Sequence, residues 1–169
     1  MHPGSDMISV DEARERILAF FDRLPVERKP LLDALGQVLA EDTVAPFDIP
    51  PLDNTAMDGY AVRAADTTGA TASTPVELRV VADLAAGYVH ETAIGPGEAV
   101  RIMTGAPIPP GADAVVPFEE TDEPLRGPNE APSRGSNVRV LNAAGAAANI
   151  RFRAEDVREG QTVIPGGRV

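Results

Sequence analysis

Residues 53–62 read DNTAMDGYAV, and they place two carboxylates, a hydroxyl and the start of a strand within ten positions. A rigid proline-rich segment, PFDIPP at residues 46–51, comes directly before them. Asp, Asn, Thr and Gly close turns with their own side chains, so a surface turn is the simplest interpretation of an isolated acidic stretch. The rest of the chain decides whether Asp53, Thr55 and Asp58 do more than that.

The residues before this stretch predict a helix. Ser9 and Glu12 have the spacing of a capping box, and apolar residues recur every three or four positions over residues 10–24. One face of this helix is expected to be buried. Pro25 is expected to end it.

A second, shorter helix is predicted from Pro30 onward, with Gly36 placed to cap it in the left-handed conformation. Residues 37–44 fit either a continuing helix or a strand. Because Gly36 interrupts the helical pattern, we favour a strand.

Beyond residue 46 the helical period disappears, and short apolar or alternating runs lie between prolines and glycines. These runs predict strands at residues 75–81, 99–103, 114–118 and 137–141. The alanine-rich residues 142–149, NAAGAAAN, are interpreted as a linker or hinge.

The predicted fold class is therefore α+β and mostly β, built as two domains. Residues 7–45 and 146–169 would form one discontinuous domain with the N-terminal helices. Residues 46–145 would form a compact β-rich domain inserted into it.

Composition excludes several classes of function. The chain has no cysteine and only two histidines, so disulfides, thiolate metal sites and a Ser-His-Asp triad are not expected. A net charge of -11 argues against non-specific nucleic-acid binding. No segment has the length of a membrane span or the pattern of a signal peptide, so a soluble cytoplasmic protein is expected.

Three stretches carry groups suited to a phosphate-like substrate with magnesium, because carboxylates and hydroxyls bind Mg²⁺ and arginine forks match tetrahedral oxyanions. Each also has a simpler interpretation: a turn, a strand end for Thr104, and a surface ion pair for Arg151 or Arg153. The stretches lie at residues 53–58, 101–107 and 149–156.

Two long motifs in the chain resemble the signatures of the MoeA and gephyrin family, the molybdopterin molybdenumtransferases. They are PPLDNTAMDGYAV at residues 50–62 and RIMTGAPIPPGADAVVPFEET at residues 101–121. Residues 34–42, ALGQVLAED, and residues 149–167, NIRFRAEDVREGQTVIPGG, resemble further family segments in the expected order. The resemblance covers nearly the whole chain, and it implies that the discontinuous domain is elongated and that the β-rich domain is inserted into it.

The resemblance implies an enzyme that inserts molybdate into adenylylated molybdopterin with Mg²⁺ present and releases AMP. It implies catalytic roles for Asp58, Thr104 and Asp156, with Asp58 also the expected Mg²⁺ ligand, and substrate or anion binding for Arg151. Asp53 is then expected to be a turn former. The resemblance also implies two partners. One is a second copy of the chain, in a homodimer that shares its active sites between subunits, and the other is a molybdopterin adenylyltransferase in the pathway.

Two departures from the family pattern qualify this expectation. The family often has glycine where this chain has Ala154, which matters if the backbone there needs a positive φ. The chain also ends at Val169, where the family continues into a pterin-binding α/β domain and a small β domain, so the chain alone is expected to be inactive. The alternative is a non-catalytic dimerisation or scaffold module of the gephyrin type, although such a module has no need of Asp58, Thr104 and Asp156 together.

Overall fold

The computed structural model describes residues 7–127 and 130–169. Contacts divide the chain into two compact units, of which the larger spans Thr43–Ile164 and the smaller holds the described residues up to Asp42 together with Pro165–Val169. The assignment of an inserted domain to residues 46–145 stays a prediction. None of the helices in the described residues is long and apolar enough to span a membrane.

The larger unit is built from short strands, which confirms the mostly-β prediction. Nine strands and one α-helix are found in the described part of the chain. They are α1 (Val10–Leu18), β1 (Thr43–Val44), β2 (Asn54–Thr55), β3 (Gly59–Val62), β4 (Val76–Leu84), β5 (Glu98–Ile102), β6 (Ala114–Pro117), β7 (Asn137–Val140), β8 (Ile150–Arg151) and β9 (Thr162–Ile164). The same described residues also contain four 3₁₀ turns: η1 (Leu31–Ala34), η2 (Ala64–Thr67), η3 (Phe118–Glu120) and η4 (Glu123–Leu125).

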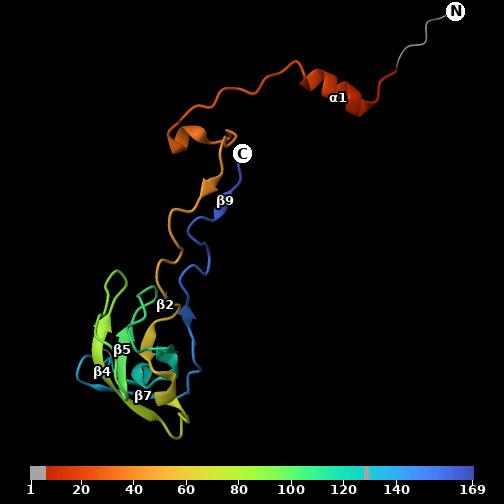
Figure 1. Cartoon of the computed structure of the whole chain (residues 1–169). Helices are drawn as coiled ribbons and strands as arrows, with labels where there is room; N and C mark the ends of the chain where they lie inside the picture. Colours follow the sequence, from red (N-terminus) through yellow and green to blue (C-terminus); the bar gives the residue numbers. More distant parts are fainter. Residues whose placement is uncertain (1–6, 128–129) are drawn as a thin grey trace, which may run out of the picture. The chain divides into compact units, whose positions relative to one another are not determined.

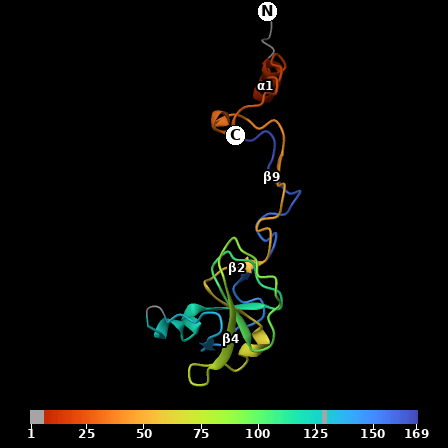
Figure 2. The same cartoon turned by 90° about the vertical axis from the view of Figure 1, so that its left-hand side faces the viewer.

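Five of these strands form one curled sheet in the order β6-β3-β5-β4-β7 (Figure 1, Figure 2). The β4 and β5 strands run parallel, and all other neighbours in this sheet are antiparallel. Two further ladders, β1 with β9 and β2 with β8, are antiparallel pairs of strands. Strands β4 to β7 coincide closely with the runs predicted from the sequence.

Both faces of the sheet are buried. Tyr60 and Val62 belong to one core cluster, whereas Ala61, between them, belongs to the other. Successive side chains of a strand point to opposite faces, so β3 contributes to both clusters. All four of its residues are buried.

The alanine-rich residues 142–149 form no helix, as predicted, but they are not a free linker. Ala144 and Ala148 pack against a core cluster. The Val115 N–H donates to the Ala148 carbonyl oxygen (2.9 Å), and the Ala147 N–H donates to the Asp113 carbonyl oxygen (2.7 Å). The segment therefore lies against the edge strand β6.

The smaller unit departs from the predicted helices. Ser9 does cap α1, since its hydroxyl accepts the Glu12 N–H (3.1 Å), but the helix ends at Leu18 and not at Pro25. No residue of α1 is buried, and Phe20, Phe21 and Leu24 are exposed, so the apolar spacing has no packing surface in the described chain to extend the helix.

The second predicted helix is reduced to the 3₁₀ turn η1, and Gly36 follows it with the expected positive φ of 78°. The strand predicted over residues 37–44 is confined to Thr43–Val44. Leu39 instead forms two isolated backbone hydrogen bonds, donating to Arg168 (2.8 Å) and accepting from Gly167 (2.7 Å).

The residue where the family often has glycine, Ala154, has a φ of 60°. Its N–H donates to the Pro50 carbonyl oxygen (3.0 Å), which holds the backbone in this left-handed conformation. An L-residue with a Cβ adopts that conformation at a cost of about 1 to 2 kcal/mol. The alanine is therefore strained.

We expect Gly59→Ala to destabilise the larger unit by about 2 kcal/mol or more, because β3 packs too closely on β6 for a side chain. A Cβ at Gly59 would overlap the Val116 carbonyl oxygen and lie 2.9 Å from its carbon. Urea unfolding gives the measurement. Gly145→Ala is the matched control, since a Cβ there meets nothing within 4 Å. Equal unfolding midpoints for the two variants would contradict the close approach.

We expect Ala154→Gly to raise the free energy of unfolding by about 0.5 to 1 kcal/mol, because relief of the positive-φ strain exceeds the added entropy of the unfolded chain. Ala65→Gly, in η2 and without a positive φ, should lower it instead. Thermal or urea unfolding of both variants measures the difference. A loss of stability in Ala154→Gly as large as in the control would show that residue 154 carries no strain.

Candidate functional site

The structure brings Asp58 and Thr104 into contact, although 46 positions separate them in the chain. One carboxylate oxygen of Asp58, Oδ1, accepts hydrogen bonds from both the backbone N–H and the hydroxyl of Thr104, each at 2.7 Å. Asp58 directly precedes β3 and Thr104 follows the end of β5. The antiparallel register that pairs Gly59 with Ile102 sets these two strand ends beside each other.

This contact favours the ionised form of Asp58. The Thr104 N–H, and then its hydroxyl, lower the pKa of the Asp58 carboxyl below its ordinary value, and the positive charge of Arg101 adds to the effect. Asp58 is exposed, so this ionised carboxylate faces solvent in a fixed orientation.

The other polar residues of the opening stretch support the loop. Thr55 is buried, and its hydroxyl accepts from the Met57 N–H (3.1 Å) and donates to the Met57 carbonyl oxygen (2.6 Å). Asp53 does more than close a local turn, because its Oδ1 accepts the N–H of Arg153 (2.7 Å), a hundred positions away.

The second predicted pair, Arg151 and Asp156, forms an ion pair with a nitrogen-to-oxygen distance of 2.5 Å. Glu155 lies 3.5 Å from the same guanidinium. The hydrogen bond and charge of Asp156 raise the pKa of Arg151. This is the surface ion pair that the sequence left open as the simpler interpretation, and Arg153 forms another, with Asp48, at 2.5 Å.

Strand β2 lies between the loop that follows Thr104 and the strand that contains Arg151. On one side, Thr55 exchanges backbone hydrogen bonds with the loop after Thr104, accepting from Gly105 (2.9 Å) and donating to Ala106 (3.1 Å). On its other side, Asn54 pairs with Arg151 in the β2–β8 ladder. The structure thus places both predicted pairs on segments that flank one short strand, while the roles assigned to them stay predictions.

A resident magnesium site is not formed by these residues alone. Within residues 7–127 and 130–169, no three Asp, Glu or His side chains gather in a geometry that could hold a metal ion. Asp58 could supply one carboxylate ligand. Mg²⁺ is often bound by one or two carboxylates together with substrate phosphates, so further ligands would have to come from outside this set.

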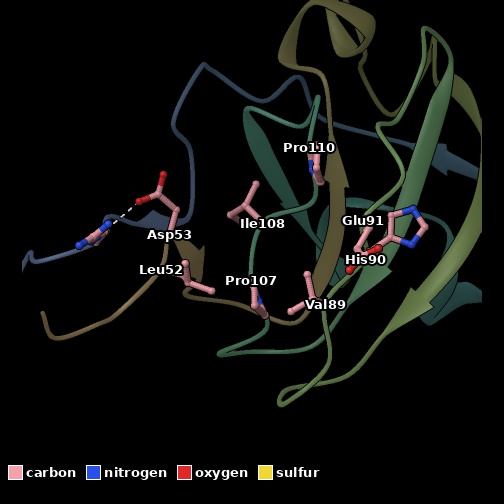
Figure 3. Close-up of a pocket in the computed structure, with 9 residues that line it drawn as sticks. Leu52, Asp53, Val89, His90, Glu91, Pro107, Ile108 and Pro110 are labelled. Atoms are coloured by element: carbon pink, nitrogen blue, oxygen red, sulfur yellow. Dashed lines mark hydrogen bonds between the residues drawn. The ribbon is translucent and has the colours of Figure 1, made fainter. Parts of the chain in front are cut away.

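An open groove of about 560 Å³ lies in the larger unit (Figure 3). Its walls are largely apolar, with Leu52, Val89 and Ile108 among them, and it also contains polar side chains such as His90 and Glu91. Asp58 and Thr104 do not line it, so the groove is distinct from the predicted pair. Periodicity in the sequence gave no sign of it, because its lining comes from loops.

The sequence alone predicted no role for Arg101, whose positive charge helps to lower the pKa of Asp58. Its position three residues before Thr104, on the predicted strand that leads to this threonine, is the signal that was available.

Comparison with known proteins places the chain in a family. Residues 8–169 match the family model described as the MoeA N-terminal region, domain I and II. Molybdopterin molybdenumtransferase 2 of Mycobacterium tuberculosis is 45% identical over 140 residues, which cover 83% of this chain and 32% of that protein. The molybdopterin molybdenumtransferase of Staphylococcus aureus is 37% identical over 162 residues, covering 96% of this chain and 36% of the relative.

Solved structures give the same result. The crystal structure of a molybdopterin biosynthesis moeA protein from Pyrococcus horikoshii OT3 matches with a TM-score of 0.79 and 37% identity, over 93% of this chain and 39% of the other. The chain spans about a third of the length of these relatives. It belongs to the MoeA family and corresponds to that family's N-terminal region.

Proposed function

We propose that this chain is the N-terminal part of a molybdopterin molybdenumtransferase, which inserts molybdate into adenylylated molybdopterin and releases AMP in molybdenum cofactor biosynthesis. Family membership supports the reaction class. The observation that carries the proposal is the Asp58 carboxylate held by both donors of Thr104, because it joins the two long motifs at one exposed point.

The charge of Asp58 limits what it can do in this reaction. Molybdate and the phosphates of the substrate are anions, so an ionised carboxylate can approach them only through a proton or a cation. Asp58 therefore suits two roles: accepting a hydrogen bond from a protonated oxygen of the substrate, or providing one oxygen ligand to Mg²⁺. Magnesium, when bound, would neutralise phosphate charge.

Thr104 has a positioning role in this proposal. Its two donors bind the same carboxylate oxygen, which fixes the direction of the carboxylate group. Arg151 would supply the cationic fork for an oxyanion, and Asp156 would orient that fork through their ion pair.

Because the chain covers about a third of its curated relatives, we propose that activity requires the rest of the protein. In this proposal the whole enzyme is a homodimer whose active sites combine parts of both subunits. Its substrate comes from a molybdopterin adenylyltransferase.

We expect Asp58→Asn, placed in the full-length protein, to lower the rate of molybdate insertion by about 100-fold, since a fixed charge at the site is lost. The free energy of unfolding should change by about 1 kcal/mol or less, because the amide keeps an acceptor oxygen for Thr104. Single-turnover formation of cofactor and urea unfolding are the two measurements.

The matched control for that variant is Asp113→Asn. The carboxylate of Asp113 also holds a backbone N–H from another segment, that of Ala64, at 2.6 Å. Its amide variant should retain the insertion rate. If both variants lose activity equally, or if Asp58→Asn loses none, Asp58 is a residue of loop structure and has no role in the reaction.

A mixed dimer tests whether the site is shared. One subunit carries Asp58→Asn, and its partner is inactivated in the region downstream of this chain. If each site takes Asp58 from one subunit and the downstream region from the other, one of the two sites contains neither defect. About half of the wild-type activity should then remain. Correctly folded mixed dimers without activity would show that each site lies within one subunit.

A further inference from the structure

A second polar cluster lies next to the Asp58–Thr104 pair and has no part in the proposal above. We call it the Glu123 cluster, and it consists of Tyr60, Arg101, Phe118 and Glu123. Tyr60 and Arg101 face each other across the β3–β5 ladder. Glu123, in η4, joins them from a distant part of the chain.

Glu123 binds both partners at once. Its Oε1 accepts from an Arg101 NH₂ group (2.6 Å), while its Oε2 accepts from the Arg101 Nε (3.2 Å) and from the Tyr60 hydroxyl (2.5 Å). The side chains of Arg101 and Glu123 are only 19% and 12% exposed. Fork-shaped pairs of this kind have a well-defined geometry, and removing one partner from a largely buried pair leaves an uncompensated charge.

Aromatic contacts immobilise the arginine further. The Arg101 guanidinium lies 4.4 Å from the centre of the Phe118 ring. Phe118 in turn meets the Tyr60 ring in an edge-on contact, with 5.5 Å between ring centres. Burial, and then the hydrogen bond to Glu123, raise the pKa of Tyr60, so its hydroxyl remains a donor.

The cluster is attached to both sides of the Asp58–Thr104 contact. Tyr60 lies two residues after Asp58, and the Phe118 N–H donates to the Asp58 carbonyl oxygen (3.2 Å). Arg101 lies three residues before Thr104, at the same end of β5. A shift of Arg101 or Tyr60 would therefore move the backbone that carries one of the two groups in contact.

We propose that Arg101, Glu123 and Tyr60 are positioning residues for the Asp58–Thr104 pair, holding the end of β5 against the start of β3 so that Thr104 keeps both hydrogen bonds to Asp58. The significance of this for catalysis rests on the proposed function, but the positioning itself does not. The rival explanation is that the cluster only stabilises the sheet. If the cluster positions Thr104, a substitution in it weakens the hydrogen bonds of Thr104 and its neighbours. If it only stabilises the sheet, the substitution weakens hydrogen bonds throughout the sheet.

The test is Glu123→Gln in this chain, with amide hydrogen exchange followed by NMR. We expect the Thr104 N–H to exchange about tenfold faster, since its hydrogen bond to a charged acceptor is weakened locally. Two amides at the opposite ends of β3 and β5 should keep their rates: that of Asp113, which donates to the Val62 carbonyl oxygen (3.0 Å), and that of Arg79, which donates to the Gly97 carbonyl oxygen (2.9 Å). A cluster that only stabilises the sheet would accelerate both sets together.

Glu98→Gln is the matched control. Glu98 also pairs with an arginine of a neighbouring strand, Arg79 at 2.5 Å, and it sits at the opposite end of β5. This variant should leave Thr104 exchange unchanged. Tyr60→Phe, which removes one hydroxyl and keeps the ring, should accelerate Thr104 exchange in the same direction as Glu123→Gln, by less.

Two variants of Arg101 separate its charge from its geometry. Arg101→Lys keeps the charge and Arg101→Met does not, and neither can form the fork with Glu123. Both should accelerate Thr104 exchange.

Unchanged Thr104 exchange in folded Glu123→Gln and Tyr60→Phe would overturn the proposal, whatever the activity of the enzyme. Faster exchange confined to Thr104 and its neighbours supports it. If the same Glu123→Gln change in the full-length transferase then leaves molybdate insertion at the wild-type rate, the positioning stands and the catalytic role of Asp58 is what fails.

Discussion

The larger unit depends on one short strand, β3, which is hydrogen-bonded along both edges and buried on both faces. Its four residues pair with β5 on one side and with β6 on the other. Residues this enclosed allow almost no variation in size, and Gly59 is the extreme case, where β6 leaves no room for a Cβ. Because Asp58 directly precedes this strand, a backbone paired on both edges helps to determine where its carboxylate lies.

The sequence predicted the parts of this fold that depend on local pattern. The runs that became β4 to β7 alternate or stay apolar between turn residues, and burial on a sheet preserves that pattern. The ladders formed by β2 with β8 and by β1 with β9 are two or three residues long and join segments far apart, so no local period marks them. The helix at residues 10–24 was predicted too long for the opposite reason. Its apolar spacing is local, but a helix without a buried face has little to stabilise its last turns.

In the candidate site, too, contacts between residues close in sequence could be predicted and long-range contacts could not. That Asp58 and Thr104 belong to one site came from the resemblance to a family and not from the residues themselves, since their contact depends on a strand register that sequence alone does not reveal. The ion pair of Arg151 with Asp156 spans five positions and could be expected from their charges. Glu123 could not be connected to Arg101 from the sequence, because the connection exists only after η4 folds back over β3 and β5.

Charge bears on what this unit can contribute to the proposed reaction. Its substrates would carry several negative charges, yet Asp58 is ionised and the nearby arginines are already paired. Arg101 is bound to Glu123, Arg151 to Asp156, and Arg153 to Asp48. Each pairing offsets the attraction that the arginine would otherwise have for an oxyanion. Residues that orient groups without adding net positive charge fit the part of a shared site that positions substrate. Apart from Arg151, whose fork the proposed function assigns to an oxyanion, further cationic groups for phosphate and molybdate would have to come from outside this unit, as the proposed site assembled from two regions would allow.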